Sequence, residues 1–173
     1  MARHRIRLLV AQVVVLAAAS MPAVAPAASA GAAARPAVEG DGAGAFIAPP
    51  GDRVSVRVSA TERSPTSPFT GEGAGRFEVT HYQRSGEVLA SLNGTVTCAS
   101  IGGKVARLTG TILAGTAPAF EGDVRGKSIA ITIVDRGPDP DLLGLTPPLD
   151  TVAPCLPAPG LATVDRGDYR VSA

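Results

Sequence analysis

The sequence predicts an all-β fold, an antiparallel meander of about six strands that forms a small barrel or a two-layer sandwich. Alternation of apolar and polar residues recurs from residue 52 onward, which is typical of half-buried strands. Glycine and proline separate the alternating segments, as expected for turns. No ten-residue window carries a helical apolar stripe. The choice between barrel and sandwich depends on edge pairing and stays open at this point.

Two segments show the alternation most clearly. In residues 53–59 three valines share one face and arginine or serine the other. In residues 76–82 the side chains of Phe77, Val79 and His81 fall on the same side. Both segments therefore predict strands with one face in a core.

A third strand is expected from Val88 to Cys98, with a change of phase near Asn93-Gly94. This dipeptide suits a tight hairpin turn because both residues tolerate positive φ angles. A β-bulge explains the phase change without adding a very short strand. We favour the bulge and keep the hairpin as the alternative.

Three more alternating segments complete the expected set, at residues 106–112, 129–133 and 161–171. The connections between strands contain turn residues. These are Ser85-Gly86, Gly102-Gly103 and Glu121-Gly122-Asp123.

Residues 1–30 are predicted to be a secretory signal peptide, so the protein is expected to be secreted and extracellular. Arginines within the first seven residues precede a small apolar run over residues 8–19, and Ala28-Ser29-Ala30 matches a cleavage site. Cleavage is expected between Ala30 and Gly31. An uncleaved membrane anchor is the alternative, but the run is shorter than the roughly 20 apolar residues that span a bilayer.

The mature chain divides into a leader and one domain. Residues 31–51 are rich in alanine, glycine and proline and predict a flexible leader, and residues 52–173 predict a secreted β domain. Without residues 1–30, 13 basic residues face 15 acidic residues, and the arginines form no cluster. Nucleic acid is therefore not expected as a partner. No second apolar stretch after the signal approaches membrane-spanning length.

Cys98 and Cys155 are the two cysteines of the chain, and in an oxidising compartment they predict one disulfide. Two free thiols are the alternative. A structural zinc site takes four ligands, whereas His81 is the one histidine after residue 30. No CxxC pair is present. We therefore expect neither a metal nor a redox cofactor.

Residues 136–160 hold seven of the 15 prolines and predict a long loop. Asp135, Asp139 and Asp141 place three carboxylates close together at its start. Calcium accepts several oxygen ligands from one loop, but the spacing matches no EF-hand. A solvated turn is favoured, and calcium binding stays open.

No residue is assigned a catalytic role, and the domain is expected not to be an enzyme. His81 is the one candidate base for a serine-type triad, and the sequence contains no G-x-S-x-G elbow. Its phase with Phe77 and Val79 predicts a strand histidine at the edge of a core. Paired carboxylates for glycoside hydrolysis remain an alternative, with no acid singled out by its context.

Residues 94–156 resemble a group of small secreted β-domain proteins from high-G+C Gram-positive bacteria, the actinobacteria. The resemblance implies an extracellular β domain and carries over no catalytic residue. The residues that carry it are turn glycines and core positions: Gly94-x-Val96-x-Cys98, Gly103 with Val105-Ala106, Gly110-Thr111-Ile112, Gly126 before Ile129, Ile131 and Ile133, Asp135-Arg136-Gly137, and Cys155-Leu156.

These observations favour a non-catalytic secreted domain that binds a cell-envelope component, another exported protein, or a small apolar ligand inside a barrel. The alternatives are a small extracellular hydrolase that uses His81 or paired carboxylates, and a protease inhibitor with an exposed loop between Asp139 and Cys155. A fully packed barrel interior would exclude the ligand carrier. The interior is expected to contain Val54, Val56, Phe77, Val79, Ile129 and Ile131.

Overall fold

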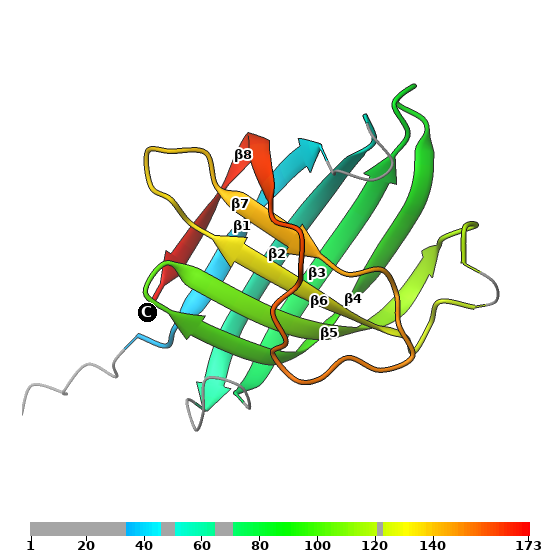
Figure 1. Cartoon of the computed structure of the whole chain (residues 1–173). Helices are drawn as coiled ribbons and strands as arrows, with labels where there is room; N and C mark the ends of the chain where they lie inside the picture. The colour runs from blue at the N-terminus through cyan, green and yellow to red at the C-terminus, as the bar shows by residue number, and fades with distance from the viewer. Residues whose placement is uncertain (1–33, 46–50, 65–70, 121–122) are drawn as a thin grey trace, which may run out of the picture. The chain divides into compact units, whose positions relative to one another are not determined.

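A computed structural model describes residues 34–45, 51–64, 71–120 and 123–173, and it shows a closed antiparallel barrel (Figure 1). Each strand pairs with the next in sequence, and the last pairs with the first, so the predicted all-β meander is confirmed as a barrel. Eight strands build it rather than six. They are β1 (Ala37–Ala45), β2 (Arg53–Ser64), β3 (Glu72–Tyr82), β4 (Val88–Gly102), β5 (Val105–Thr116), β6 (Ser128–Val134), β7 (Leu142–Leu145) and β8 (Ala162–Ser172).

Strand β4 runs without interruption through Asn93-Gly94. Its register with β5 shifts between these two residues, so the alternative hairpin is wrong, but the extra residue at this shift is Leu113 of β5 and not a residue of β4. A second shift follows between Val96 and Cys98. Between the two shifts the inward positions are occupied by Gly94 and Val96. After the second shift Ala99 and Ile101 are buried.

Strand β1 corrects the sequence analysis, which assigned residues 37–45 to a flexible leader. The strand pairs along its length with β2 and also with β8. Apart from Val38, its inward positions are Gly40, Gly42 and Gly44. Glycine supplies no apolar side chain, and the usual alternation is therefore invisible in the sequence. The barrel consequently begins before residue 52.

Strand β7 is the second correction, because it lies inside the segment predicted as one continuous loop. Leu142–Leu145 pairs with β6 over four residue pairs and with β8 over two. A strand of four residues flanked by prolines is too short to show a period. Its short pairing with β8 makes this seam the least hydrogen-bonded part of the barrel wall.

Two buried carboxylates of the β6–β7 connection complete the seam before the backbone of β7 begins. Asp141 Oδ2 accepts a hydrogen bond from the Tyr169 N–H at 2.8 Å, and Asp135 Oδ2 accepts one from the Val171 N–H at 3.0 Å. Asp135 also pairs with Lys104 Nζ at 2.9 Å. These side chains satisfy N–H groups of β8 that would otherwise lack partners.

Two aromatic rings fill the part of the interior farther from the β3–β4 turn, and each lies over glycines of neighbouring strands. A Cβ atom on Gly42 would lie 2.6 Å from Cε2 of Tyr169, and one on Gly110 would lie 2.5 Å from Cε1 of Phe77. The Tyr169 hydroxyl donates to the Val56 carbonyl at 2.8 Å, and burial raises the pKa of this hydroxyl well above its ordinary value. The glycines are therefore part of the packing.

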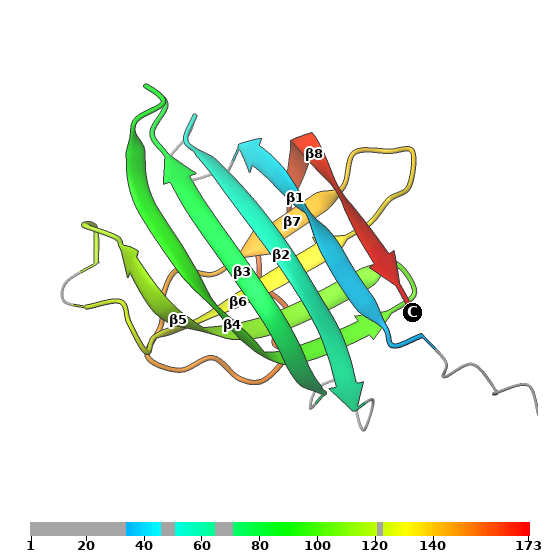
Figure 2. The same ribbon diagram turned by 180° about the vertical axis from the view of Figure 1, so that it is seen from behind.

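The segment 146–161, which we name the strap, crosses the outer face of β5 and β6 in Figure 1 and lies on the far side in Figure 2. Thr109 Oγ1 donates to the Ala153 carbonyl at 3.1 Å, and the Ala158 N–H donates to Thr132 Oγ1 at 2.8 Å. The disulfide between Cys98 of β4 and Cys155 of the strap confirms the predicted bridge. The strap thus buries the outer face of β6, whose inner face is already in the core.

Candidate functional site

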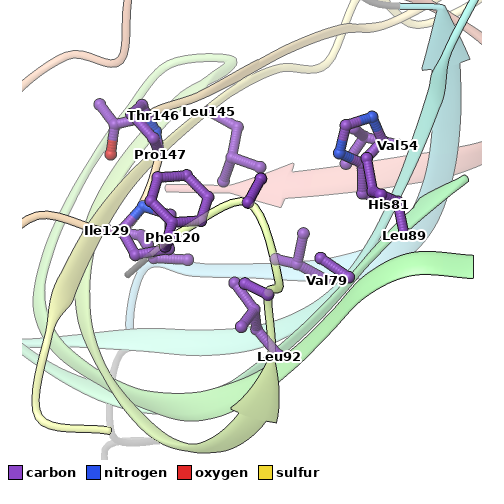
Figure 3. A pocket seen from close by; sticks show the side chains of 14 residues that line it. Val54, Val79, His81, Leu89, Leu92, Phe120, Ile129, Leu145, Thr146 and Pro147 are labelled. Carbon is purple, nitrogen blue, oxygen red and sulfur yellow. The ribbon is translucent and has the colours of Figure 1, made fainter. Parts of the chain in front are cut away.

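An apolar cavity of about 410 Å³ opens at one end of the barrel, which we name the mouth. The mouth is the end where β3 finishes and β4 begins, and where β5 finishes and β6 begins. Side chains from strands and from their connections surround the cavity (Figure 3). The lining residues are Val54, Val79, His81, Leu89, Ala90, Leu92, Ala117, Ala119, Phe120, Ile129, Leu145, Thr146, Pro147 and Pro148.

The barrel interior predicted from the sequence divides into two parts. The residues that line the cavity are Val54, Val79 and Ile129. The residues that are packed deeper in the barrel are Val56, Phe77 and Ile131, each at most 1% exposed. The interior is therefore filled in one part and hollow at the mouth.

His81 is the one titratable side chain among the described residues that line the cavity, and Figure 3 shows its imidazole directed into it from β3. Its Nε2 lies 3.0 Å from Oδ2 of Asp52, the residue immediately before β2. The other oxygen of Asp52 accepts the N–H of Arg84 at 3.2 Å. The Asp52 side chain is 11% exposed, so this carboxylate is held in place and orients the imidazole.

Thr146 lies across the cavity from His81 (Figure 3). Its Oγ1 accepts the Ala130 N–H at 2.9 Å, and its own N–H donates to the Ala130 carbonyl at 3.1 Å. These bonds extend the wall where β7 ends. Among the described lining residues there is no serine or cysteine, and the Thr146 hydroxyl lies on the opposite side from His81, so the cavity brings no hydroxyl or thiol nucleophile next to His81.

The acidic residues considered for calcium have other partners. Asp135 and Asp141 accept backbone hydrogen bonds at the seam, as described above. The Val171 N–H, followed by the Lys104 ammonium, holds the pKa of Asp135 below its ordinary value. Asp139 is exposed, 3.8 Å from the Arg136 guanidinium. Over the residues that the structure describes, no group of three His, Cys, Asp or Glu side chains could hold a metal ion.

The segment between Asp139 and Cys155, considered as an inhibitor loop, contributes β7 to the barrel and then follows the wall as the strap. Its Thr146 and Leu149 backbones bond to β6. Much of its main chain is therefore already paired with the barrel.

Sequence reasoning placed His81 on the core face of its strand, and the structure confirms this position. It missed Asp52 and Phe120. Asp52 lies just before the first alternating segment and Phe120 lies in the β5–β6 connection, so neither shows a strand period. Only the tertiary structure brings these two residues close to the cavity.

No protein-family model, curated protein or solved structure matches this chain. Within the described ranges, no helix is long and apolar enough to cross a membrane. The geometry of the mouth therefore carries the functional argument.

Proposed function

We propose that the protein is a secreted, non-catalytic barrel that binds a small apolar ligand in its mouth. The cavity of about 410 Å³ is the observation that carries this proposal. Small-molecule sites have volumes of roughly 300–1,000 Å³ and are lined mainly by apolar side chains with a few polar groups. The mouth fits this description, since His81 and Thr146 are the polar side chains among its described lining residues.

A small ligand is favoured over an exported protein or a cell-envelope polymer because the apolar surface is concave. The exposed large apolar side chains of the described residues belong to separate segments: Val88 begins β4, Leu113 lies on β5, and Leu149, Leu156 and Leu161 belong to the strap. A macromolecular partner usually needs a broad apolar face or a standard-sized interface.

Secretion is part of the proposal. The signal peptide predicted for residues 1–30 and its cleavage site between Ala30 and Gly31 lie outside the described residues. The disulfide between Cys98 and Cys155 supports an oxidising compartment, where such bonds persist. The resemblance to actinobacterial secreted β domains points the same way.

Binding is tested on protein purified from culture medium after export. Native mass spectrometry would detect a retained ligand as excess mass, and N-phenyl-naphthylamine, a neutral fluorescent probe, would report the empty cavity. We expect probe fluorescence to rise in the wild type. If neither a retained ligand nor probe binding is found, the proposed function is wrong.

A matched pair of variants on β4 locates the probe. Ala90→Phe fills the cavity, because Ala90 lines it, and should weaken probe binding at least tenfold. Ser91→Phe adds the same ring at the next residue, which is exposed, and should leave binding unchanged. Equal binding by both variants would place the probe outside the mouth.

The contact between His81 and Asp52 favours a second candidate, a small hydrolase in which His81 acts as general base toward water. The carboxylates Asp135 and Asp141 do not support the paired-carboxylate version, because they bond to β8 and do not line the cavity. Generic ester, peptide and glycan substrates would test this candidate. Activity that His81→Ala abolishes without unfolding the protein would replace the binding proposal.

A further inference from the structure

The mouth contains two polar side chains among its described lining residues, and His81 is the one more accessible to a ligand. Thr146 is 7% exposed, and its Oγ1 accepts the Ala130 N–H of β6. His81 uses Nε2 for Asp52, whereas its Nδ1 has no hydrogen-bond partner among the described residues. Since His81 is 25% exposed and lines the cavity, a molecule in the mouth has access to this ring. A ligand therefore meets an apolar wall in which the His81 ring is the more exposed of two polar groups.

The environment of His81 determines what this ring can bind. The Asp52 carboxylate accepts hydrogen bonds only, so Nε2 carries the proton that the two groups share. In a neutral imidazole the other ring nitrogen is then an acceptor. The N–H of Arg84 fixes the second oxygen of Asp52 and keeps the carboxylate beside the ring. In its neutral form His81 consequently presents Nδ1 as an oriented acceptor.

On the basis of the proposed function, we propose that the ligand is an amphipathic molecule with an uncharged hydroxyl head, which donates a hydrogen bond to Nδ1 of His81. Its apolar body lies against Val79, Leu92 and Phe120, which line the same cavity. A carboxylate head is disfavoured. Asp52 carries negative charge close to the binding point, and no lysine or arginine is among the described lining residues to compensate for it.

Three probes of equal chain length test this specificity at pH 8: decanol, decyl methyl ether and decanoate, each displacing N-phenyl-naphthylamine. Decanol should bind about two- to tenfold more tightly than the ether, the ratio expected for one neutral hydrogen bond. Decanoate should bind most weakly. This ranking in the wild type tests the proposal without relying on any variant.

Variants then connect the ranking to the histidine. His81→Phe keeps the apolar wall but removes the acceptor, so it should bind the ether as well as the wild type does and lose the preference for decanol. Asp52→Ala tests Asp52 as a positioning residue and should reduce the same preference. The control is Asp165→Ala, because this carboxylate pairs with Arg53 on the outer surface and does not line the cavity. The control should keep the wild-type ranking.

The outcomes separate this inference from the proposed function. If the probe binds but decanol and the ether compete equally, or decanoate competes best, the hydroxyl-specific site is wrong and the apolar carrier stands. If a folded His81→Phe variant retains the preference, His81 is not the recognition group. If the probe does not bind at all, the proposed function itself fails.

Discussion

The packed part of the barrel interior and its mouth are built from the same strands but filled by different means. In the packed part Phe77 and Tyr169 lie over glycines of adjacent strands, and both side chains are 1% exposed. At the mouth the strands present alanine, medium-sized aliphatic residues and His81, and the one phenyl ring among the described lining residues, that of Phe120, comes from a connection between strands. About 410 Å³ remains unfilled there.

This difference shows what determines whether side chains fill the interior of a small barrel. An interior of eight strands is just wide enough for side chains to fill or to hold one small ligand. The large rings fill one part because glycines on the facing strands leave space for them. Where the strands lack rings of this size, the volume stays available to a ligand.

The largest effect is expected from removing a ring in the packed part. Phe77→Ala should lower the free energy of unfolding by about 3–5 kcal/mol, since it leaves a cavity among close-packed atoms. Leu92→Ala at the mouth should lower the free energy of unfolding by about 2 kcal/mol or less, because Leu92 already borders open space. Urea unfolding of both variants makes the comparison. Equal losses would show that the mouth is as tightly packed as the rest.

Loss of the disulfide should have the next largest effect. The bridge closes a loop of 57 residues, and a double variant with Cys98→Ser and Cys155→Ser should be about 2–4 kcal/mol less stable. The same urea titration measures this loss. Probe binding at the mouth should persist at temperatures where the double variant is folded. If it vanishes while near-ultraviolet circular dichroism stays native, the strap is needed for the cavity and not only for stability.

A smaller effect is expected from the seam that joins β8 to the packed part. The folded-state pKa of Asp135 is below its unfolded value, so its contribution to stability is fully present above about pH 4 and is lost as the pH falls through the folded pKa. Asp135→Asn should be less stable than the wild type at pH 7 and should lose less on acidification. Urea midpoints between pH 7 and pH 2 test this. Parallel pH profiles would contradict it.

The smallest effect on stability should come from enlarging a residue at the mouth. Ala90→Phe should change the free energy of unfolding by less than about 1 kcal/mol, because its ring enters existing space. Gly94→Ala on the same strand should cost about 1–3 kcal/mol, because its new methyl group would overlap the Phe77 ring. Thermal and urea unfolding would compare them. A reversed order would mean that the cavity is not open in solution.

The sequence predicted the strands whose inward positions carry large apolar side chains. The valines of β2 and the isoleucines of β6 show a period of two because each second residue enters the core. β1 was missed because its inward residues are mostly glycines, whose role depends on the Tyr169 ring far along the chain. β7 was missed because four residues contain no usable period.

The candidate site was predictable only in part. The phase of His81 with Val79 placed it on the core face, and the cavity confirms that orientation. Its partner Asp52 lies immediately before β2, and no local sequence pattern connects two residues that are 29 positions apart. The cavity itself is a shortage of side-chain volume in three dimensions, which no single strand reveals. The pairing of the two cysteines was predictable because a chain with two offers one combination.

The glycine-rich inner face of β1 has a consequence for how the chain folds. Ala37 pairs with Ser172, and the ring that covers Gly42 belongs to Tyr169. The first strand therefore gains little apolar burial until the last strand arrives, so these contacts form only after a long loop has closed. Because β1 is synthesised before the other strands, it must avoid aggregation until β8 has formed. Its glycines and acidic residues have a low tendency to aggregate, which protects β1 during the time before it pairs with β8.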